Sequence, residues 1–144
     1  MTTNGSAMPS FDDTQFLPLE RDAAIMERVA DLIGRANQRQ VWLLFLDELE
    51  RQLPLLIPIE SLPTWPSTQE TAAVLDRVRE VMGDIGARSI VVVFERYGPA
   101  ALSEQDIAWA STVRDQCGSA GVTLRAMLLS HRSGVRWIAP DDLA

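Results

Sequence analysis

The chain has 144 residues, 47% of them hydrophobic and 23% charged, which suits one folded domain and excludes bulk disorder. Its net charge of −7 and its scattered basic residues, all 13 of them arginine, disfavour nucleic acid as a partner. One histidine and one cysteine exclude a disulfide scaffold and a zinc site built from several such ligands.

The absence of several sequence motifs excludes further classes of function. Without lysine, neither a Walker-type phosphate loop nor a Schiff base can form, and no glycine-rich nucleotide motif occurs. No apolar run approaches the ~20 residues of a membrane span, and the first residues lack the pattern of a secretory signal. We therefore expect a cytoplasmic protein with no cofactor, no metal and no contact with membranes.

The first part of the chain predicts an arm, a helix and a strand. Residues 1–18 lack periodicity and predict a flexible arm, followed by a single α/β domain over residues 19–144. Apolar positions recur at helical spacing between Glu20 and Ala36, which predicts an amphipathic helix. The apolar run Val41–Leu46 is typical of a buried strand.

Two prolines indicate where the second strand, Leu53–Ile59, lies in the sheet. Pro54 and Pro58 share parity, so their missing N–H groups fall on one side of the strand, which must be an open edge. An open edge invites a partner strand, although prolines also prevent such pairing. Trp65, in the loop that follows, is suited to anchor a partner. Pro54, Leu56, Pro58 and Trp65 are therefore the predicted partner-binding residues.

Two capping-box patterns begin the later helices. The first, Ser67-Thr-Gln-Glu70, begins a helix whose inner face is predicted to carry Val74, Val78, Val81, Met82 and Ile85. The β-branched run Ser89–Phe94 predicts the central strand. The second pattern, Ser103-Glu-Gln-Asp106, begins a helix that ends at Gly121.

Two strands, Val122–Ser130 and Val135–Ala139, complete the element order α-β-β-α-β-α-β-β, with a turn at His131–Gly134. This order predicts an α/β fold, a three-layer α/β/α domain with a five-stranded mixed sheet. The helical connections make the second, third and fourth strands parallel. Their carboxyl ends should therefore share one rim with the N-termini of the two later helices.

Polar residues gather at this predicted rim. Glu95, Arg96 and Tyr97 follow the central strand, His131 follows the fourth strand, and Asp106 lies in the first turn of the last helix. Because open sheets commonly bind ligands at such a rim, Glu95, Tyr97, Asp106 and His131 are candidate catalytic residues. The alternative interpretation is that Asp106 only caps its helix and that Glu95-Arg96-Tyr97 is a solvated loop.

Three segments of the second half are similar in layout to the RadC-type JAB/MPN domain: Ser89–Pro99, Leu102–Asp106 and Gly121–Leu129. By position, Asp106 matches the aspartate ligand of that family, but the two histidine positions fall on Val93 and Glu95. The resemblance therefore implies a related fold in which the metal ligands are missing.

The element order also resembles the cytidine-deaminase-like fold, which implies a deaminase-like topology. That family places zinc motifs at the start of the second and third helices, where this chain reads Ser67-Thr-Gln-Glu70 and Ser103-Glu-Gln-Asp106, so zinc activation of water is not implied. A third similarity, carried by Val91–Tyr97 and Gly134–Trp137, is to an uncharacterised actinobacterial domain family and implies no activity.

Two functions follow from these observations. The missing catalytic motifs favour a non-catalytic interaction or regulatory module that binds a protein partner or self-associates. The alternative is a metal-independent hydrolase or small-ligand-binding domain that uses the polar residues of the rim.

Overall fold

The computed structural model describes residues 21–36 and 38–144, so the arm predicted for residues 1–18 lies outside the described residues. The described elements, in chain order, are α2 Asp22–Leu32, β1 Gln40–Leu46, β2 Gln52–Glu60, α3 Thr68–Ile85, β3 Ser89–Glu95, α4 Glu104–Ala120, β4 Leu124–His131, β5 Gly134–Trp137 and the 3-10 helix η1 Pro140–Leu143. The mixed α/β class predicted from the sequence is confirmed. None of the helices in these two ranges combines the length and the apolar character needed to cross a membrane.

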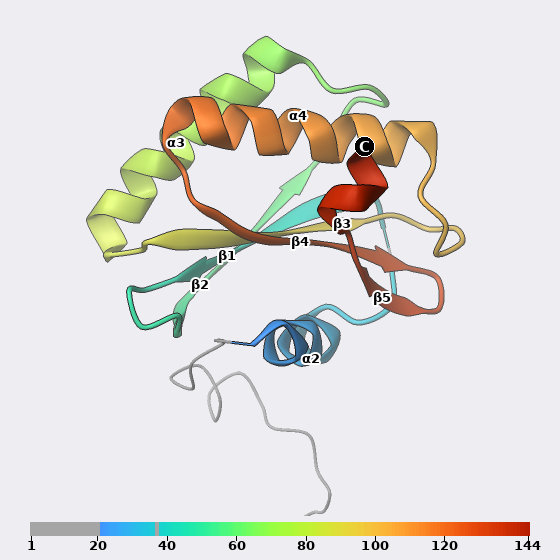
Figure 1. The fold of residues 1–144 in the computed structure, drawn as a ribbon, viewed down its shortest axis with the longest axis horizontal. Helices are drawn as coiled ribbons and strands as arrows, with labels where there is room; N and C mark the ends of the chain where they lie inside the picture. The colour runs from blue at the N-terminus through green and yellow to red at the C-terminus, as the bar shows by residue number, and fades with distance from the viewer. Residues whose placement is uncertain (1–20, 37) are drawn as a thin grey trace, which may run out of the picture.

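The five strands form a mixed sheet, as predicted, and the structure gives their order as β2-β1-β3-β4-β5. β1 is antiparallel to β2 and to β3, β3 is parallel to β4, and β5 is antiparallel to β4. β2, β3 and β4 therefore run in the same direction, and their carboxyl ends, Glu60, Glu95 and His131, point the same way. Helices α3 and α4 lie on one face of the sheet and α2 lies on the other (Figure 1).

β3 forms the centre of the core, because all seven of its residues are buried. Its side chains alternate between the two faces of the sheet. Ile90 and Val92 belong to the apolar cluster beneath α3 and α4, whereas Val91 and Val93 belong to the cluster against α2. A continuous β-branched run is typical of a strand that is covered on both faces.

Two predicted boundaries at the rim are wrong. Glu95, predicted to begin a loop, is the last residue of β3 and is 4% exposed. His131, predicted to begin a turn, is the last residue of β4 and is 7% exposed. Both strands continue because their neighbours continue beside them: Glu95 pairs with Gln40 of β1 and Ser130 of β4, and His131 pairs with Gly134 of β5.

Other elements differ from the prediction at their ends. The first helix ends at Leu32, four residues early, and Gly34 just beyond it has a φ of 66°, a value that glycine adopts most easily. β4 begins at Leu124, two residues after the predicted start at Val122. β5 ends at Trp137, two residues early, before the chain turns into η1.

β2 lies at the edge of the sheet, as its prolines predict. Pro54 and Pro58 are exposed, and Leu56 between them is half-buried. Because proline has no N–H, the strand cannot donate a hydrogen bond to a further strand at these two positions. The edge is therefore poorly suited to pair with another chain.

Phe45 of β1 is fully buried in the cluster beneath α3 and α4. Phe45→Ala should lower the free energy of unfolding by about 3–5 kcal/mol, because the substitution leaves a cavity in the core. Urea unfolding followed by circular dichroism measures this change. As a control, Leu49→Ala in the exposed turn after β1 should change stability by less than about 0.5 kcal/mol. Equal effects of the two substitutions would contradict this core.

Candidate functional site

The rim of the sheet carries all four candidate catalytic residues, but the sheet divides them between its two faces. Side chains two residues apart on a strand lie on the same face, so Glu95 lies on the face of Val91 and Val93, which packs against α2. Arg96, the next residue, lies toward the opposite face, where it pairs with Asp106 at the start of α4. The carboxylates of Glu95 and Asp106 therefore have separate hydrogen-bond partners, although both residues line a small cavity of about 30 Å³ at the rim.

Glu95 is a buried carboxylate that accepts three hydrogen bonds from the start of β1 and the segment before it. The donors are the backbone N–H of Gln38 at 3.1 Å, the side-chain amide of Gln40 at 2.7 Å and the indole N–H of Trp42 at 2.9 Å. Glu95 thus connects the end of β3 to the beginning of β1. This role is structural, and it differs from the solvated loop that the sequence suggested as an alternative.

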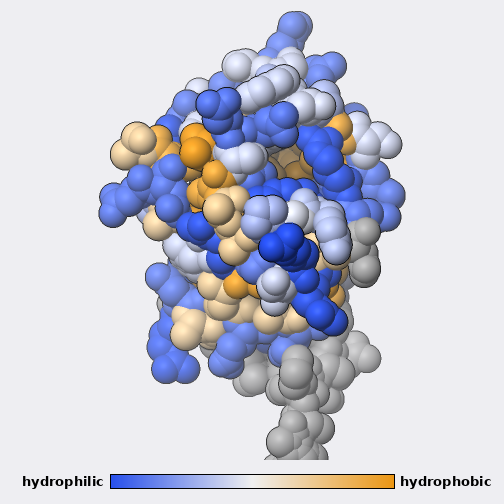
Figure 2. All heavy atoms as spheres, turned by 90° about the vertical axis from the view of Figure 1, so that its right-hand side faces the viewer, coloured by the Kyte–Doolittle hydropathy of each residue, from blue (hydrophilic) through white to orange (hydrophobic). Residues whose placement is uncertain are grey.

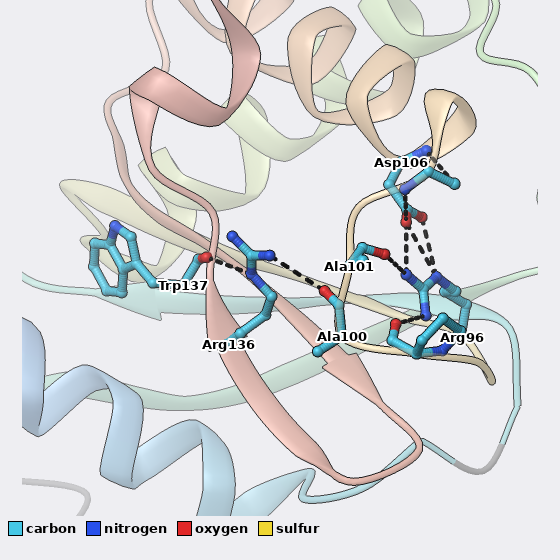
Figure 3. A network of polar contacts seen from close by, with 8 residues as sticks. Arg96, Ala100, Ala101, Asp106, Arg136 and Trp137 are labelled. Carbon is cyan, nitrogen blue, oxygen red and sulfur yellow. Dashed lines mark hydrogen bonds and ion pairs between the residues drawn. The ribbon is translucent and has the colours of Figure 1, made fainter.

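Arg96 and Asp106 form a largely buried ion pair that shapes the loop after β3 (Figure 3). The guanidinium approaches the carboxylate at 2.7 Å and also donates to the carbonyls of Pro99 at 2.6 Å and Ala101 at 3.0 Å. Asp106 accepts a hydrogen bond from the backbone N–H of Ser103 at 2.9 Å, while the Ser103 hydroxyl accepts one from the N–H of Asp106 at 3.1 Å. The capping box predicted for α4 is therefore confirmed.

The surroundings of Asp106 keep it ionised. Burial alone raises the pKa of this carboxyl, but hydrogen bonds from Arg96 and Ser103 and the charge of Arg96 outweigh burial and hold the pKa below its ordinary value. A carboxylate with a lowered pKa is a weak base. Asp106 is thus suited to hold the loop and the helix rather than to transfer protons.

His131 is buried at the end of β4, close to three arginines. Its Nδ1 accepts a hydrogen bond from the backbone N–H of Ser133 at 3.2 Å. Burial, and then the charges of Arg96, Arg136 and Arg132, hold the pKa of His131 below its ordinary value. The imidazole is therefore neutral at neutral pH.

A second arginine ties the same loop to the end of the chain. Arg136 of β5 donates to the carbonyl of Ala100 at 3.2 Å, to the carbonyl of Trp137 at 3.0 Å and to the carboxylate of Asp142 at 3.0 Å. In Figure 3 the guanidinium groups of Arg96 and Arg136 approach the loop from two sides. The positively charged groups of this rim are thus largely occupied by contacts within the chain.

Tyr97 is solvent-exposed, with 75% of its surface accessible. It lines a polar groove of about 360 Å³ together with Gln38, Arg39, Arg96, Ser103, Gln105, Asp106 and Trp109. Of the four candidate catalytic residues, the groove contains only Tyr97 and Asp106. General acid–base catalysis needs two groups that face one substrate, and this groove provides an exposed phenol and a carboxylate already held by Arg96.

An apolar pocket of about 450 Å³ lies between β1, β2, α3 and α4, and Trp109 lines both this pocket and the polar groove. Its buried lining includes Val41, Leu43, Leu75, Val92 and Val113. Its exposed lining includes Glu60, Ser61 and Glu70. Figure 2, which views the molecule from the right-hand side of Figure 1, shows mostly hydrophilic residues around smaller hydrophobic areas.

The loop between β2 and α3 forms one wall of this pocket and is fixed at three carbonyls. Arg39 donates to the carbonyl of Leu62 and, at 2.6 Å, to that of Pro63. The indole N–H of Trp109 donates to the carbonyl of Thr64 at 3.2 Å. The wall therefore has a defined position before any ligand arrives.

Two exposed apolar side chains, Trp65 and Val74, lie at or beside the pocket. Among the described residues four large hydrophobic side chains are exposed: Leu49, Trp65, Val74 and Tyr97. Trp65, 53% exposed as predicted, belongs to the loop that borders the pocket, and Val74, 41% exposed, lines it. The prediction that Val74 faces the core is wrong, because Leu75 takes the inner position on α3.

Neither the donors to Glu95 nor the apolar pocket was predicted from the sequence. Gln38, Gln40 and Trp42 are spaced two residues apart, and this spacing could have identified them as neighbours on one face of an extended chain. On α3, the adjacent apolar residues Val74 and Leu75 make the apolar stripe wider than packing against the core requires, and this signal could have indicated one wall of the pocket.

Comparison with known proteins assigns no family. The chain matches none of the models of known protein families, and no curated protein matches it. These results neither support nor contradict the three resemblances suggested by the sequence. Within the part of the chain that the structure describes, no three His, Cys, Asp or Glu side chains lie together as a metal site would require.

Asp106→Ala should lower the free energy of unfolding by about 1–3 kcal/mol at neutral pH, because it removes a helix cap and the partner of Arg96. The pKa of Asp106 is lowered in the folded protein, so this stabilisation is present above the ordinary carboxyl pKa of about 3.9 and is lost as pH falls through the folded pKa. Urea unfolding at several pH values measures both effects. Glu104→Ala, an exposed change in the same helical turn, is the control. A difference between wild type and Asp106→Ala that persists in strong acid would contradict this assignment.

Acid should also weaken the protein through His131. Its pKa is lowered in the folded protein, so the cost is absent above the ordinary histidine pKa of about 6.5 and is complete below the folded pKa. His131→Gln should remove this part of the pH dependence. Because the chain has one histidine, an NMR titration of its imidazole reports the folded pKa directly, and a value above the ordinary one would contradict the described surroundings.

Proposed function

We propose that this chain is a non-catalytic interaction module whose protein partner docks on the apolar pocket and on Trp65 and Val74 beside it. The observation that carries the proposal is a preformed apolar pocket with exposed Val74 in its lining and exposed Trp65 in the loop that borders it. Protein interfaces draw most of their binding energy from a few apolar or aromatic residues that fill such pockets.

The state of the rim residues also favours binding over catalysis. Glu95 faces α2 and accepts three hydrogen bonds from neighbouring segments. Asp106 is ion-paired and caps α4. Since a general acid and a general base must face the same substrate, two acidic groups on opposite faces of the sheet are poorly placed to cooperate.

Among the predicted partner-binding residues, Trp65 belongs to the proposed surface, whereas Pro54, Leu56 and Pro58 lie on the outer strand β2. Strand addition or self-association along β2 would need backbone donors that the two prolines lack. We therefore place the partner at the pocket and not along the edge of the sheet.

A second candidate function is small-ligand binding or metal-independent hydrolysis in the polar groove. The exposed Tyr97 and the guanidinium of Arg39, which line the groove, support it, and these two groups would suit a small ligand with an anionic end. Tyr97→Phe would then impair the activity or the binding, while Val74→Asp on the other side of Trp109 would leave it intact.

We also propose that the domain has a three-layer, deaminase-like arrangement and acts in the cytoplasm. The strand order β2-β1-β3-β4-β5 and the placement of α2 opposite α3 and α4 support the first part. The acidic composition is compatible with the second.

Selection of random peptides displayed on phage against the immobilised full chain tests the interaction function. Selected peptides should bind Val74→Asp at least tenfold more weakly than wild type and Trp65→Ala about tenfold more weakly, since hot-spot residues contribute about 1–2 kcal/mol or more. Leu49→Asp is the matched control, because Leu49 is equally exposed apolar surface in the distant turn after β1.

Circular dichroism and urea unfolding show whether each variant is folded, so that lost binding is not confused with lost structure. Peptides that bind wild type, Val74→Asp and Leu49→Asp with equal affinity would contradict a partner site at the pocket.

A further inference from the structure

The charges at the opening of the pocket indicate what kind of partner it takes. We propose that the partner is a basic peptide segment that inserts one large apolar side chain into the pocket and places a flanking Arg or Lys against Glu60 and Glu70. This inference rests on the proposed interaction function, because it names the occupant of the same site.

Glu60 and Glu70 approach the opening from two different elements. Glu60 ends β2, and Glu70 lies in the first turn of α3. Both residues are exposed and both line the pocket, whose lining contains no basic residue. Two carboxylates beside one apolar opening form a site that attracts a positive charge.

Neither carboxylate is neutralised within the described part of the chain. No arginine lies within ion-pair distance of Glu60 or Glu70 there, and Glu60 accepts only a long hydrogen bond of 3.4 Å from the side chain of Gln38. Arg39 already donates to the carbonyls of Leu62 and Pro63. The carboxylates of Glu60 and Glu70 are therefore available to pair with a basic group of a partner.

The interior of the pocket is suited to bind an apolar group. Val41, Leu43 and Val92 of the sheet are almost fully buried and line it, and a volume of about 450 Å³ falls in the range of sites that enclose a small ligand. A single aromatic or branched aliphatic side chain fits within such a space. Burying that side chain supplies affinity, while the acidic opening supplies orientation.

A peptide explains the surface around the pocket better than a small molecule does. Trp65 does not line the pocket, and Val74 has 41% of its surface exposed. A ligand held inside the pocket would leave Trp65 uncovered, whereas an extended segment that continues beyond its anchor would cover it. The net charge of −7 also favours encounters with a basic partner.

Fluorescence anisotropy with defined peptides tests this inference on the full chain. The probe is a short fluorescein-labelled peptide with one tryptophan between arginines. One comparison peptide has alanine in place of tryptophan, and another has glutamates in place of the arginines. The arginine–tryptophan peptide should bind at low salt and weaken as salt is added. The alanine peptide should bind about tenfold more weakly, and the glutamate peptide should not bind.

Substitutions in the protein assign the charge. Glu60→Gln with Glu70→Gln should weaken binding of the arginine–tryptophan peptide by about tenfold at low salt and flatten its salt dependence. The matched control, Glu27→Gln with Asp84→Asn, makes the same change in net charge at exposed positions on α2 and at the end of α3, and should weaken binding less than about twofold.

The outcomes separate this inference from the function on which it rests. If library peptides or the probe lose binding on Val74→Asp but not on Glu60→Gln with Glu70→Gln, the interaction function stands and the basic partner is overturned. If the two pairs of charge substitutions weaken binding equally, attraction to the overall charge explains the result and the acidic opening is overturned. If Val74→Asp does not change the binding affinity either, both proposals fail.

Discussion

Burial of β3 on both faces is the constraint on which the rest of the structure depends. The strand lies between β1 and β4, and its alternate side chains supply both apolar clusters, one beneath α3 and α4 and one against α2. Where the apolar run ends, the same alternation continues into polar residues. Glu95 therefore falls on one face and Arg96 on the other, and the charged side chains of the rim form two separate hydrogen-bond networks.

The separated networks give the rim rigid loops. Arg96 and Arg136 hold the loop after β3, while Arg39 and Trp109 hold the carbonyls of the loop after β2. A site whose walls are already ordered loses little conformational entropy when a partner binds. The contacts of Arg39 and Trp109 thus hold a wall of the apolar pocket in which we propose that the partner docks.

Features that act over a few residues were predictable from the sequence, and features that depend on distant segments were not. The cap at Ser103 and the edge position implied by Pro54 follow from local geometry, and both are confirmed. The burial of Glu95 depends on donors more than fifty positions earlier in the chain, near Gln40. The pocket likewise combines strands, helices and a loop, so the adjacent apolar residues Val74 and Leu75 indicate only its wall on α3. Val74 was wrongly predicted to face the core because its exposure depends on how α3 lies against the sheet.

The prolines of β2 have a consequence for how the protein behaves when it is concentrated. Without them, the segment from Leu53 to Ile59 would be an uncharged, strongly apolar run of the kind that stacks into amyloid fibrils. Pro54 and Pro58 leave only three consecutive residues between them that could join such a stack. Two side chains that add little to the core therefore protect the domain from aggregation, and they do so from the moment the strand leaves the ribosome, before α3 and α4 have been synthesised.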